Sequence, residues 1–266
     1  MSLYFLPLSV FSGASIALVL LRKGFTEAVS ILTISALLIV ISFLVSPTKP
    51  GFPIPVVFAL WIPVLVGAWW LRRNASQSAA LIAVGVVCAL FVIGMYLAVG
   101  DVVTWWNDWI ATAMPGVRDS ATADFGPEDN IRLANGFVAM LLGFAAMFTL
   151  LFARWMQGSL FNPGGFAAEF VSIKLSRMIL IEVLGLLVIS SLFNEQTMTD
   201  LFMVAIMVYF FPGISALHGI VIRRRLNRNW LVLPYIGLVF VPQILIPLLA
   251  FIGVADSLID FRSHRK

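Results

Sequence analysis

The chain has 266 residues and a formal net charge of +4 at pH 7; 61% of its residues are hydrophobic and only 11% are charged. A soluble domain carries about 25% charged residues, so this composition excludes a water-exposed globular domain and indicates an integral membrane protein. The positive charge does not call for a nucleic-acid partner, because the arginines lie where membrane topology places them.

The apolar runs are long and continuous. Backbone polar groups in a bilayer must be hydrogen-bonded within the protein, which leaves helices or closed barrels, and continuous runs of roughly 20 residues favour helices. We predict an all-α fold: one polytopic transmembrane helix bundle over residues 1–266, with about eight spans and one or two interfacial amphipathic helices. The predicted spans are Tyr4–Leu21, Ala28–Val45, Pro53–Leu71, Ser78–Gly100, Gly136–Ala153, Met178–Phe193, Thr199–Ile222 and Trp230–Val254.

Basic residues predict the orientation, because lysine and arginine collect on the cytoplasmic side of a membrane. Most of them follow the odd-numbered spans: Arg22, Lys23, Arg72, Arg73, Arg154, Lys174, Arg177, Arg223, Arg224, Arg225 and Arg228. With eight spans, both termini then face outward.

The longest polar connection, residues 101–135, is predicted to face outward. Its first part, 101–114, reads DVVTWWNDWIATAM and places Val102, Trp106 and Trp109 on one helical face. Tryptophan prefers the headgroup level, so we expect an amphipathic helix lying in the interface. Such a helix is either a lid over an outward cavity or an anchor.

A second amphipathic segment is predicted on the cytoplasmic side at residues 163–177, after an NPGG turn that breaks any helix. Phe166, Phe170 and Ile173 lie along one stripe, and Glu169 and Lys174 are available to headgroups or to a partner. This segment is either a coupling element or an anchor.

Polar residues inside spans are costly and therefore informative. His218 lies in the stretch YFFPGISALHGIVIRRR, five residues before Arg223. It is either a substrate contact or proton carrier, or a packed ring bonded to another helix, with Glu182 as one candidate partner. The candidate substrate-binding residues are His218, Gln243, Tyr209, Tyr235 and Glu182.

Prolines and glycines predict breaks in the last two spans. In the seventh span Pro212 removes a backbone hydrogen bond, and Gly213 permits another chain or a ligand to approach the backbone closely. In the eighth span Pro242 and Pro247 each remove a backbone hydrogen bond. Broken helices are favoured substrate sites in transporters, but kinks in well-packed helices are the equal alternative.

The first span is rich in small residues, with Gly13 and Ala17 at the four-residue spacing of close helix contacts. This face either packs inside the bundle or docks a separate membrane protein.

No catalytic residues, cofactor or metal site are predicted. The sequence has no glycine loop of the phosphate-binding type, no HExxH and no GxSxG. Zinc needs three or four ligands, whereas the chain has two histidines and a single cysteine, Cys88, inside a span.

The stretches SGASIALVLLRKG, AAEFVSIKLSR and YFFPGISALHGIVIRRR resemble the YybS-like family of bacterial membrane proteins, a domain of unknown function. The resemblance implies a location in the bacterial cytoplasmic (inner) membrane. It also implies a distant similarity to the S components of energy-coupling-factor transporters, helical bundles that hold a small molecule and dock a coupling protein through small residues of the first helix. Gly13 and Ala17 match that role, although the S-component core has six spans and the family's own function is not established.

Two classes of function remain open. The first is a transport subunit that binds a small molecule between the seventh and eighth spans and is gated by the tryptophan helix. The second is a scaffold without transport activity that organises other membrane proteins. Expected partners are the lipid bilayer and either another membrane protein or further copies of the chain.

Overall fold

The computed structural model describes residues 6–45, 54–113 and 131–259, and every regular element in these ranges is helical. This agrees with the all-α prediction. The elements are α1 (Leu6–Arg22), α2 (Phe25–Val45), α3 (Ile54–Asn74), α4 (Gln77–Val99), α5 (Val102–Ala113), α8 (Ala134–Phe161), α9 (Gly165–Val171), α10 (Arg177–Phe193), α11 (Glu195–Arg223), the 3-10 helix η2 (Arg228–Leu231), α12 (Val232–Phe240) and α13 (Pro242–Leu258).

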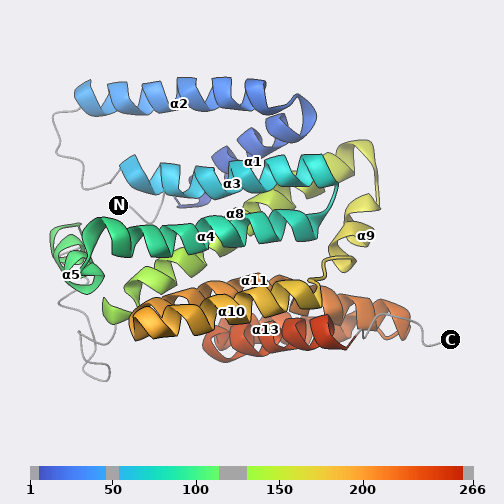
Figure 1. The fold of residues 1–266 in the computed structure, drawn as a ribbon. Coiled ribbons are helices and arrows are strands. Elements are labelled where there is room, and N and C mark those ends of the chain that lie inside the picture. Colours follow the sequence, from blue (N-terminus) through green and yellow to red (C-terminus); the bar gives the residue numbers. More distant parts are fainter. Residues whose placement is uncertain (1–5, 46–53, 114–130, 260–266) are drawn as a thin grey trace.

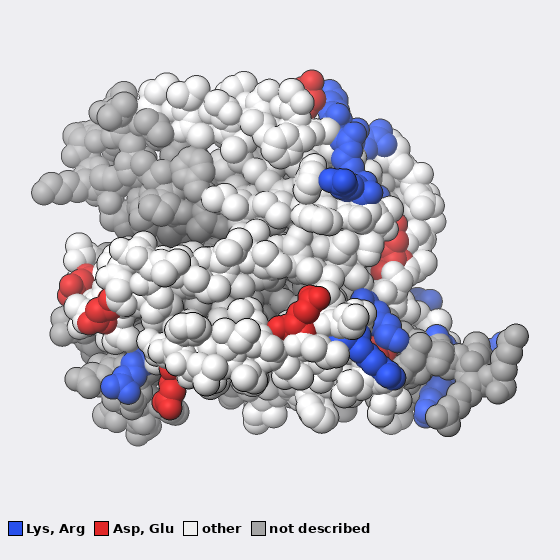
Figure 2. All heavy atoms as spheres, in the orientation of Figure 1, with Lys and Arg blue, Asp and Glu red and all other residues white. Residues whose placement is uncertain are grey.

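The long helices form a bundle in which successive helices run in opposite directions (Figure 1). One end, called the arginine end below, holds Arg22, Arg72 and Arg177. The other end, called the α5 end, holds α5 and the start of α11 (Figure 1). On the face drawn in Figure 2, most lysines and arginines gather at the arginine end, and the broad surface between the two ends is uncharged apart from an acidic side chain near its centre.

Three helices in the described part of the chain are long and apolar enough to cross a membrane: Gln77–Val99, Ala134–Phe161 and Glu195–Arg223. Large apolar side chains also cover the outside of the bundle, as on α10, where Leu192 and Phe193 are 80% and 85% exposed. Such a surface is stable in lipid and unfavourable in water, in agreement with a membrane protein.

Several helix ends follow from capping residues. The Ser76 hydroxyl accepts a hydrogen bond from the backbone N–H of Ala79 at the start of α4, and Asn194 caps α11 through the N–H of Gln196. Gly100 ends α4 with φ of 75°, a conformation that favours glycine. Short polar side chains at these positions satisfy N–H groups that the helix leaves without partners.

The centre of the bundle is formed by α8 and α11, which both contact α4 and contact each other. Met147 and Leu150 of α8 and Met207 and Phe211 of α11 are almost completely buried. Because lipid is as apolar as these side chains, close packing rather than water exclusion holds such helices together. By contrast, the main contact of α2 in the described residues is with α1.

The predicted eighth span, Trp230–Val254, is a hairpin and not a single crossing. The chain turns back at Val241, so that a Cβ atom built on Gly237 of α12 would lie 3.1 Å from Cγ of Leu245 in α13. Arg177 donates a hydrogen bond to the Leu258 carbonyl, which holds the end of α13 at the arginine end. The start of α1 and the end of α13 therefore lie toward opposite ends of the bundle (Figure 1), and the side of the membrane on which each terminus lies stays a prediction.

The predicted helix breaks have different outcomes. α11 continues through Pro212 and Gly213 as one helix of 29 residues. Between α12 and α13 the helix does break, with Pro242 as the first residue of α13, whereas Pro247 lies within that helix. The proline at a helix start costs little because its missing N–H has no intrahelical partner there.

Candidate functional site

The five predicted substrate contacts do not share one cavity. His218 and Tyr235 meet at the arginine end, whereas the Tyr209 side chain is buried inside α11's core face and is only 2% exposed. Gln243 and Glu182 are exposed on the outer surfaces of α13 and α10. The five residues therefore fall into a His218–Tyr235 pair, a buried Tyr209 and two separate exposed positions.

His218 is held by neighbours other than Glu182. Its Nδ1 lies 3.0 Å from the Ile214 carbonyl oxygen, and its Nε2 lies 3.3 Å from the Tyr235 hydroxyl. A carbonyl only accepts, so Nδ1 carries the proton and Nε2 accepts from Tyr235. The Phe170 ring of α9 meets the imidazole edge to face at 5.3 Å. His218 therefore connects α9, α11 and α12.

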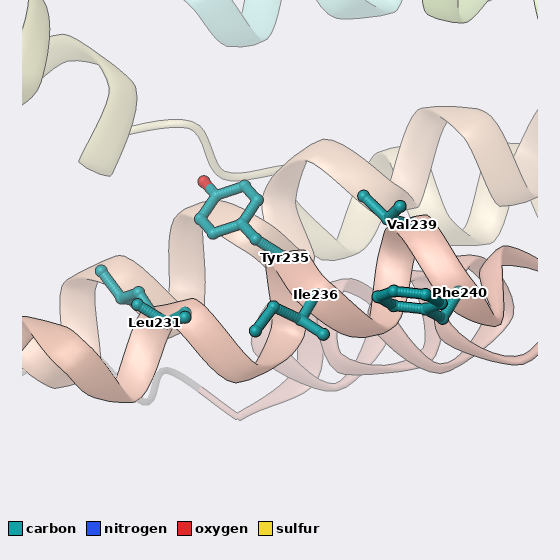
Figure 3. Close-up of a pocket in the computed structure, with 6 residues that line it drawn as sticks. Leu231, Tyr235, Ile236, Val239 and Phe240 are labelled. Carbon is teal, nitrogen blue, oxygen red and sulfur yellow. The ribbon is translucent and has the colours of Figure 1, made fainter.

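Tyr235 also lines an open apolar groove of about 400 Å³ on the outer side of α12 (Figure 3). The Tyr235 hydroxyl points away from Ile236 and Phe240 in this view. The groove has the character of a surface that faces lipid or another apolar helix. Its lining residues are Leu231, Val232, Tyr235, Ile236, Val239 and Phe240.

At the α5 end, a buried carboxylate connects four helices. Asp200 of α11 has no exposed surface, and its Oδ2 accepts hydrogen bonds from the Tyr96 hydroxyl of α4 at 2.8 Å and from Nδ2 of Asn135 in α8 at 2.9 Å. The Asn135 Oδ1 in turn accepts from the indole N–H of Trp106 in α5 at 3.4 Å. We call Trp106, Asn135, Asp200 and Tyr96 the Asp200 network.

The carboxylate also replaces a missing helix cap. α8 follows Leu133, whose side chain makes no capping hydrogen bond. Asp200 approaches this helix start so closely that a Cβ built on Gly136 would lie 2.6 Å from Asp200 Cα and 2.8 Å from its Oδ1. The Gly136 backbone N–H interacts with the same carboxylate. A negative group is favourable at a helix N-terminus, so Asp200 stabilises the start of α8 from a neighbouring helix.

Only neutral groups donate to Asp200 in the described part of the chain, and its Oδ1 has no hydrogen-bond partner of good geometry there. One turn earlier on α11, Gln196 is half-buried and donates to the Arg132 carbonyl. Gln196 therefore lies between the carboxylate and the outer surface of the α5 end.

α5 coincides with the helix predicted at 101–114, whose position in the membrane interface stays a prediction, and Val102 and Trp106 are its most buried side chains. Asp101 caps it: Oδ1 and Oδ2 accept from the N–H and the hydroxyl of Thr104 at 3.1 and 2.7 Å. These hydrogen bonds hold the pKa of the Asp101 carboxyl below its usual value. The rest of the predicted loop, residues 114–130, lies outside the described residues.

The predicted cytoplasmic segment, 163–177, is helical in α9, Gly165–Val171, and again only at Arg177, where α10 begins. Glu169 binds Arg154 of α8 through both carboxylate oxygens, and Gln77 lies beside it. The Arg154 hydrogen bonds lower the pKa of Glu169, against the opposing effect of burial. Ser215 of α11 donates to the Phe170 carbonyl at 2.8 Å. α9 is thus fastened across the arginine end of α8 and α11.

Gly13 and Ala17 face the inside of the bundle. Ala17 has no exposed surface, and a Cβ built on Gly13 would lie 3.1 Å from Thr149 Cγ2 of α8. Of the two predicted roles, this arrangement corresponds to internal packing, and it leaves no room for a docked partner at these two residues.

Among the described residues, no group of three or more His, Cys, Asp or Glu side chains is placed to hold a metal ion. Comparisons of the chain with protein-family models, with curated proteins and with solved structures found no match. The resemblance to the YybS-like family stays a prediction.

Asp200 was not among the candidates from the sequence, although a signal existed. It lies six residues into a 29-residue apolar helix, and intramembrane acids are functional candidates by default. It is the second residue of the predicted span Thr199–Ile222. Its contacts with Tyr96 and Asn135 come from distant parts of the chain and leave no local pattern.

Proposed function

We propose that this chain is a multi-pass protein of the bacterial cytoplasmic membrane that works as a small-molecule-binding transport subunit, with the arginine end in the cytoplasm and α5 as its outer gate. The observation that carries this proposal is the unbroken chain of hydrogen bonds from Trp106 of α5 through Asn135 to the buried Asp200. The excess of basic residues at one end supports the orientation.

A buried carboxylate in an apolar bundle is energetically costly, and such groups mark transport pathways and proton relays more often than they serve packing alone. Here the carboxylate accepts hydrogen bonds from two neutral side chains, Tyr96 and Asn135, and it also interacts with the Gly136 N–H and the Gln196 amide, which are neutral as well. Neutral donors stabilise the charge without cancelling it, so the site retains attraction for a cationic or hydrogen-bond-donating group.

The gate role of α5 follows from how it is attached. Trp106 is its one side chain with a described hydrogen bond to another helix, and that bond ends on Asn135, next to the carboxylate. A ligand group that takes the Asn135 amide or the Asp200 carboxylate competes directly with this attachment. Binding at Asp200 and the position of α5 are then coupled.

Native mass spectrometry of gently extracted protein tests the proposal. The wild-type chain should retain a small molecule, and Asp200→Asn, which keeps the shape but removes the charge, should lose it. Trp106→Phe should keep the ligand but exchange it faster, because the ring remains and the N–H is lost. Trp105→Phe, on the neighbouring and more exposed indole, is the matched control and should behave as wild type.

Two results contradict the proposal: retention of no small molecule by the wild-type chain, or equal retention by Asp200→Asn. A copurifying membrane protein in place of a small molecule would support the second candidate function.

That second candidate is an assembly subunit without transport activity. The observation in its favour is the outer face of α12, where Val239 and Phe240 are each 77% exposed and no residue of the helix is buried. Phe240→Ala should then release a partner in a pull-down while leaving the melting temperature unchanged. Loss of the partner together with a lower melting temperature would instead indicate a damaged fold.

A further inference from the structure

Four cations from two helix ends form a patch at the arginine end. Arg22 is the last residue of α1 and Lys23 follows it directly, and Arg72 and Arg73 lie in the last turn of α3. Arg72 joins the two ends: its Nη1 donates to the Leu20 carbonyl at 2.6 Å and lies 3.0 Å from a Cβ built on Gly24. Figure 2 shows lysine and arginine side chains gathered over this part of the molecule.

No carboxylate forms an ion pair with these cations in the described part of the chain. The ion pair found there joins Arg154 and Glu169. The nearest acid along the chain is Glu27, which is exposed in the first turn of α2. The patch therefore keeps a positive charge that an external anion can neutralise.

Each arginine also keeps hydrogen-bond donors for a ligand. Guanidinium has five N–H donors, and one of those on Arg72 is taken by the Leu20 carbonyl. Arg22 lies over the Phe161 ring with its Cζ 3.7 Å from the centroid, and Arg73 lies 5.5 Å from the centroid of Trp69. Neither ring contact uses up the N–H donors of the guanidinium group, and these donors suit the oxygens of a phosphate group.

An open groove of about 560 Å³ begins directly beside this patch on α2. Along its length Ser30 and Thr33 donate their hydroxyls to backbone carbonyls of their own helix, each at 2.9 Å. With the hydroxyls satisfied, the groove presents an apolar surface despite these residues. It is lined by Phe25, Thr26, Val29, Ser30, Thr33 and Ile34.

Aromatic side chains mark the level of the patch. Phe25, Trp69 and Trp70 are 56%, 37% and 39% exposed, and exposed tryptophans prefer the headgroup level of a bilayer. Cations and aromatic rings at one depth, with an apolar groove leading away from them along a helix, match the shape of a single phospholipid.

We propose that the arginine end binds an anionic phospholipid, with its phosphate on Arg72, Arg73, Lys23 and Arg22 and one acyl chain in the α2 groove. The charge complementarity of the patch selects an anionic headgroup over a zwitterionic one. This inference does not depend on the transport proposal, since the lipid site lies at the opposite end of the bundle from Asp200.

Lipid retention measured by native mass spectrometry tests it. Purified protein is mixed with phosphatidylglycerol or with phosphatidylcholine, and retained lipid is counted as the detergent concentration rises. Wild-type protein should retain one phosphatidylglycerol and lose phosphatidylcholine. The double variant Lys23→Gln with Arg73→Gln should weaken phosphatidylglycerol binding by about fivefold for each cation, the equivalent of roughly 1 kcal/mol each.

The matched control is Arg224→Gln with Arg228→Gln, which removes the same charge from exposed residues near the same end of the bundle. It should leave retention unchanged. If both double variants lose the lipid equally, net charge rather than the patch governs binding and the proposal fails. Equal retention of both lipids by the wild-type protein also overturns it.

The groove is tested separately. Ser30→Phe fills it and should reduce retention of the two-chain lipid, while Ser191→Phe on the exposed face of α10 should have no effect. Inorganic phosphate is the third probe. If it displaces the lipid at millimolar concentration, the patch is a phosphate site with no contribution from α2, and the acyl-chain part of the proposal is wrong.

Discussion

Gly213 of α11 and Gly253 of α13 meet backbone to backbone where the two helices pack together. A Cβ built on Gly213 would overlap the Leu249 carbonyl oxygen, and one built on Gly253 would overlap the Tyr209 carbonyl oxygen. Small residues allow this approach, as they do at other close helix contacts in membranes. The hairpin formed by α12 and α13 therefore packs against α11 through backbone contacts that a residue larger than glycine at 213 or 253 would prevent.

Gly213→Ala or Gly253→Ala should lower the melting temperature of the detergent-solubilised protein, since backbone atoms cannot move aside as side chains do. Overpacking of this kind costs about 1–3 kcal/mol or more. The matched controls are Gly94→Ala and Gly185→Ala, two helical glycines with open space where a Cβ would lie. An unchanged melting temperature in both core variants would show that the helices do not meet there.

Gly136→Ala should disturb the Asp200 network without touching its hydrogen-bonding side chains. The added methyl group would lie 2.8 Å from Asp200 Oδ1, so the carboxylate and the start of α8 must separate. Hydrogen exchange of α5 and of residues 131–137 should increase, whereas exchange at α9 should stay the same. A uniform increase over the whole chain would instead mean global destabilisation.

The Arg154–Glu169 pair predicts an acid-dependent release of α9. The pKa of Glu169 is lower in the folded protein than in the unfolded chain, so its stabilising contribution is present above the unfolded pKa and is lost as the pH falls through the folded value. Both side chains are more than a quarter exposed, so solvent screening keeps the contribution near the 0.2–1 kcal/mol of exposed pairs.

The protection factors of the amides at residues 165–176, which correct for the pH dependence of intrinsic exchange, should therefore be constant from pH 7 to about pH 5 and fall below the unfolded carboxyl pKa of about 4.3. Glu169→Gln should show the reduced protection already at pH 7 and no further loss with acid. A transition between pH 6 and 7 would point to a different titrating group.

The hairpin predicts which residues label from the same side of the membrane. In a Cys88→Ala background, Leu258→Cys and Asn74→Cys should react with a membrane-impermeant maleimide from one side, and Asn107→Cys from the other. If Leu258→Cys and Asn107→Cys instead label from the same side, residues 230–254 cross the membrane once and the hairpin is wrong. All three positions are exposed or half-buried in the structure.

The sequence predicted the helices well where apolar length and caps decide them. α4 begins and ends within one residue of the predicted span because Ser76 and Gly100 cap it. The prediction from the sequence failed for the hairpin of α12 and α13. Pro242 was recognised as a helix break, but the reversal of chain direction at this break was not predicted. That direction depends on the meeting of Gly213 and Gly253, which are distant in sequence.

The candidate site was harder to predict for a similar reason. For His218 the sequence left open a substrate contact, a proton carrier or a ring bonded to another helix with Glu182 as one candidate partner, and in the structure the neighbouring helix contributes Tyr235 and not Glu182. Asp200 acquires its environment from Tyr96, Asn135 and Gly136, which belong to two other helices. A single sequence reports which residues are polar in an apolar run, but not which of them converge.

The continuity of α11 through Pro212 has a mechanical consequence. One uninterrupted rod carries Asp200 near one end, Gly213 at its middle and Ser215 and His218 toward the other. A rise of 1.5 Å per residue separates Asp200 from His218 by about 27 Å. A small axial shift of this helix would move the carboxylate at one end of the bundle and the contacts of α9 at the other end together.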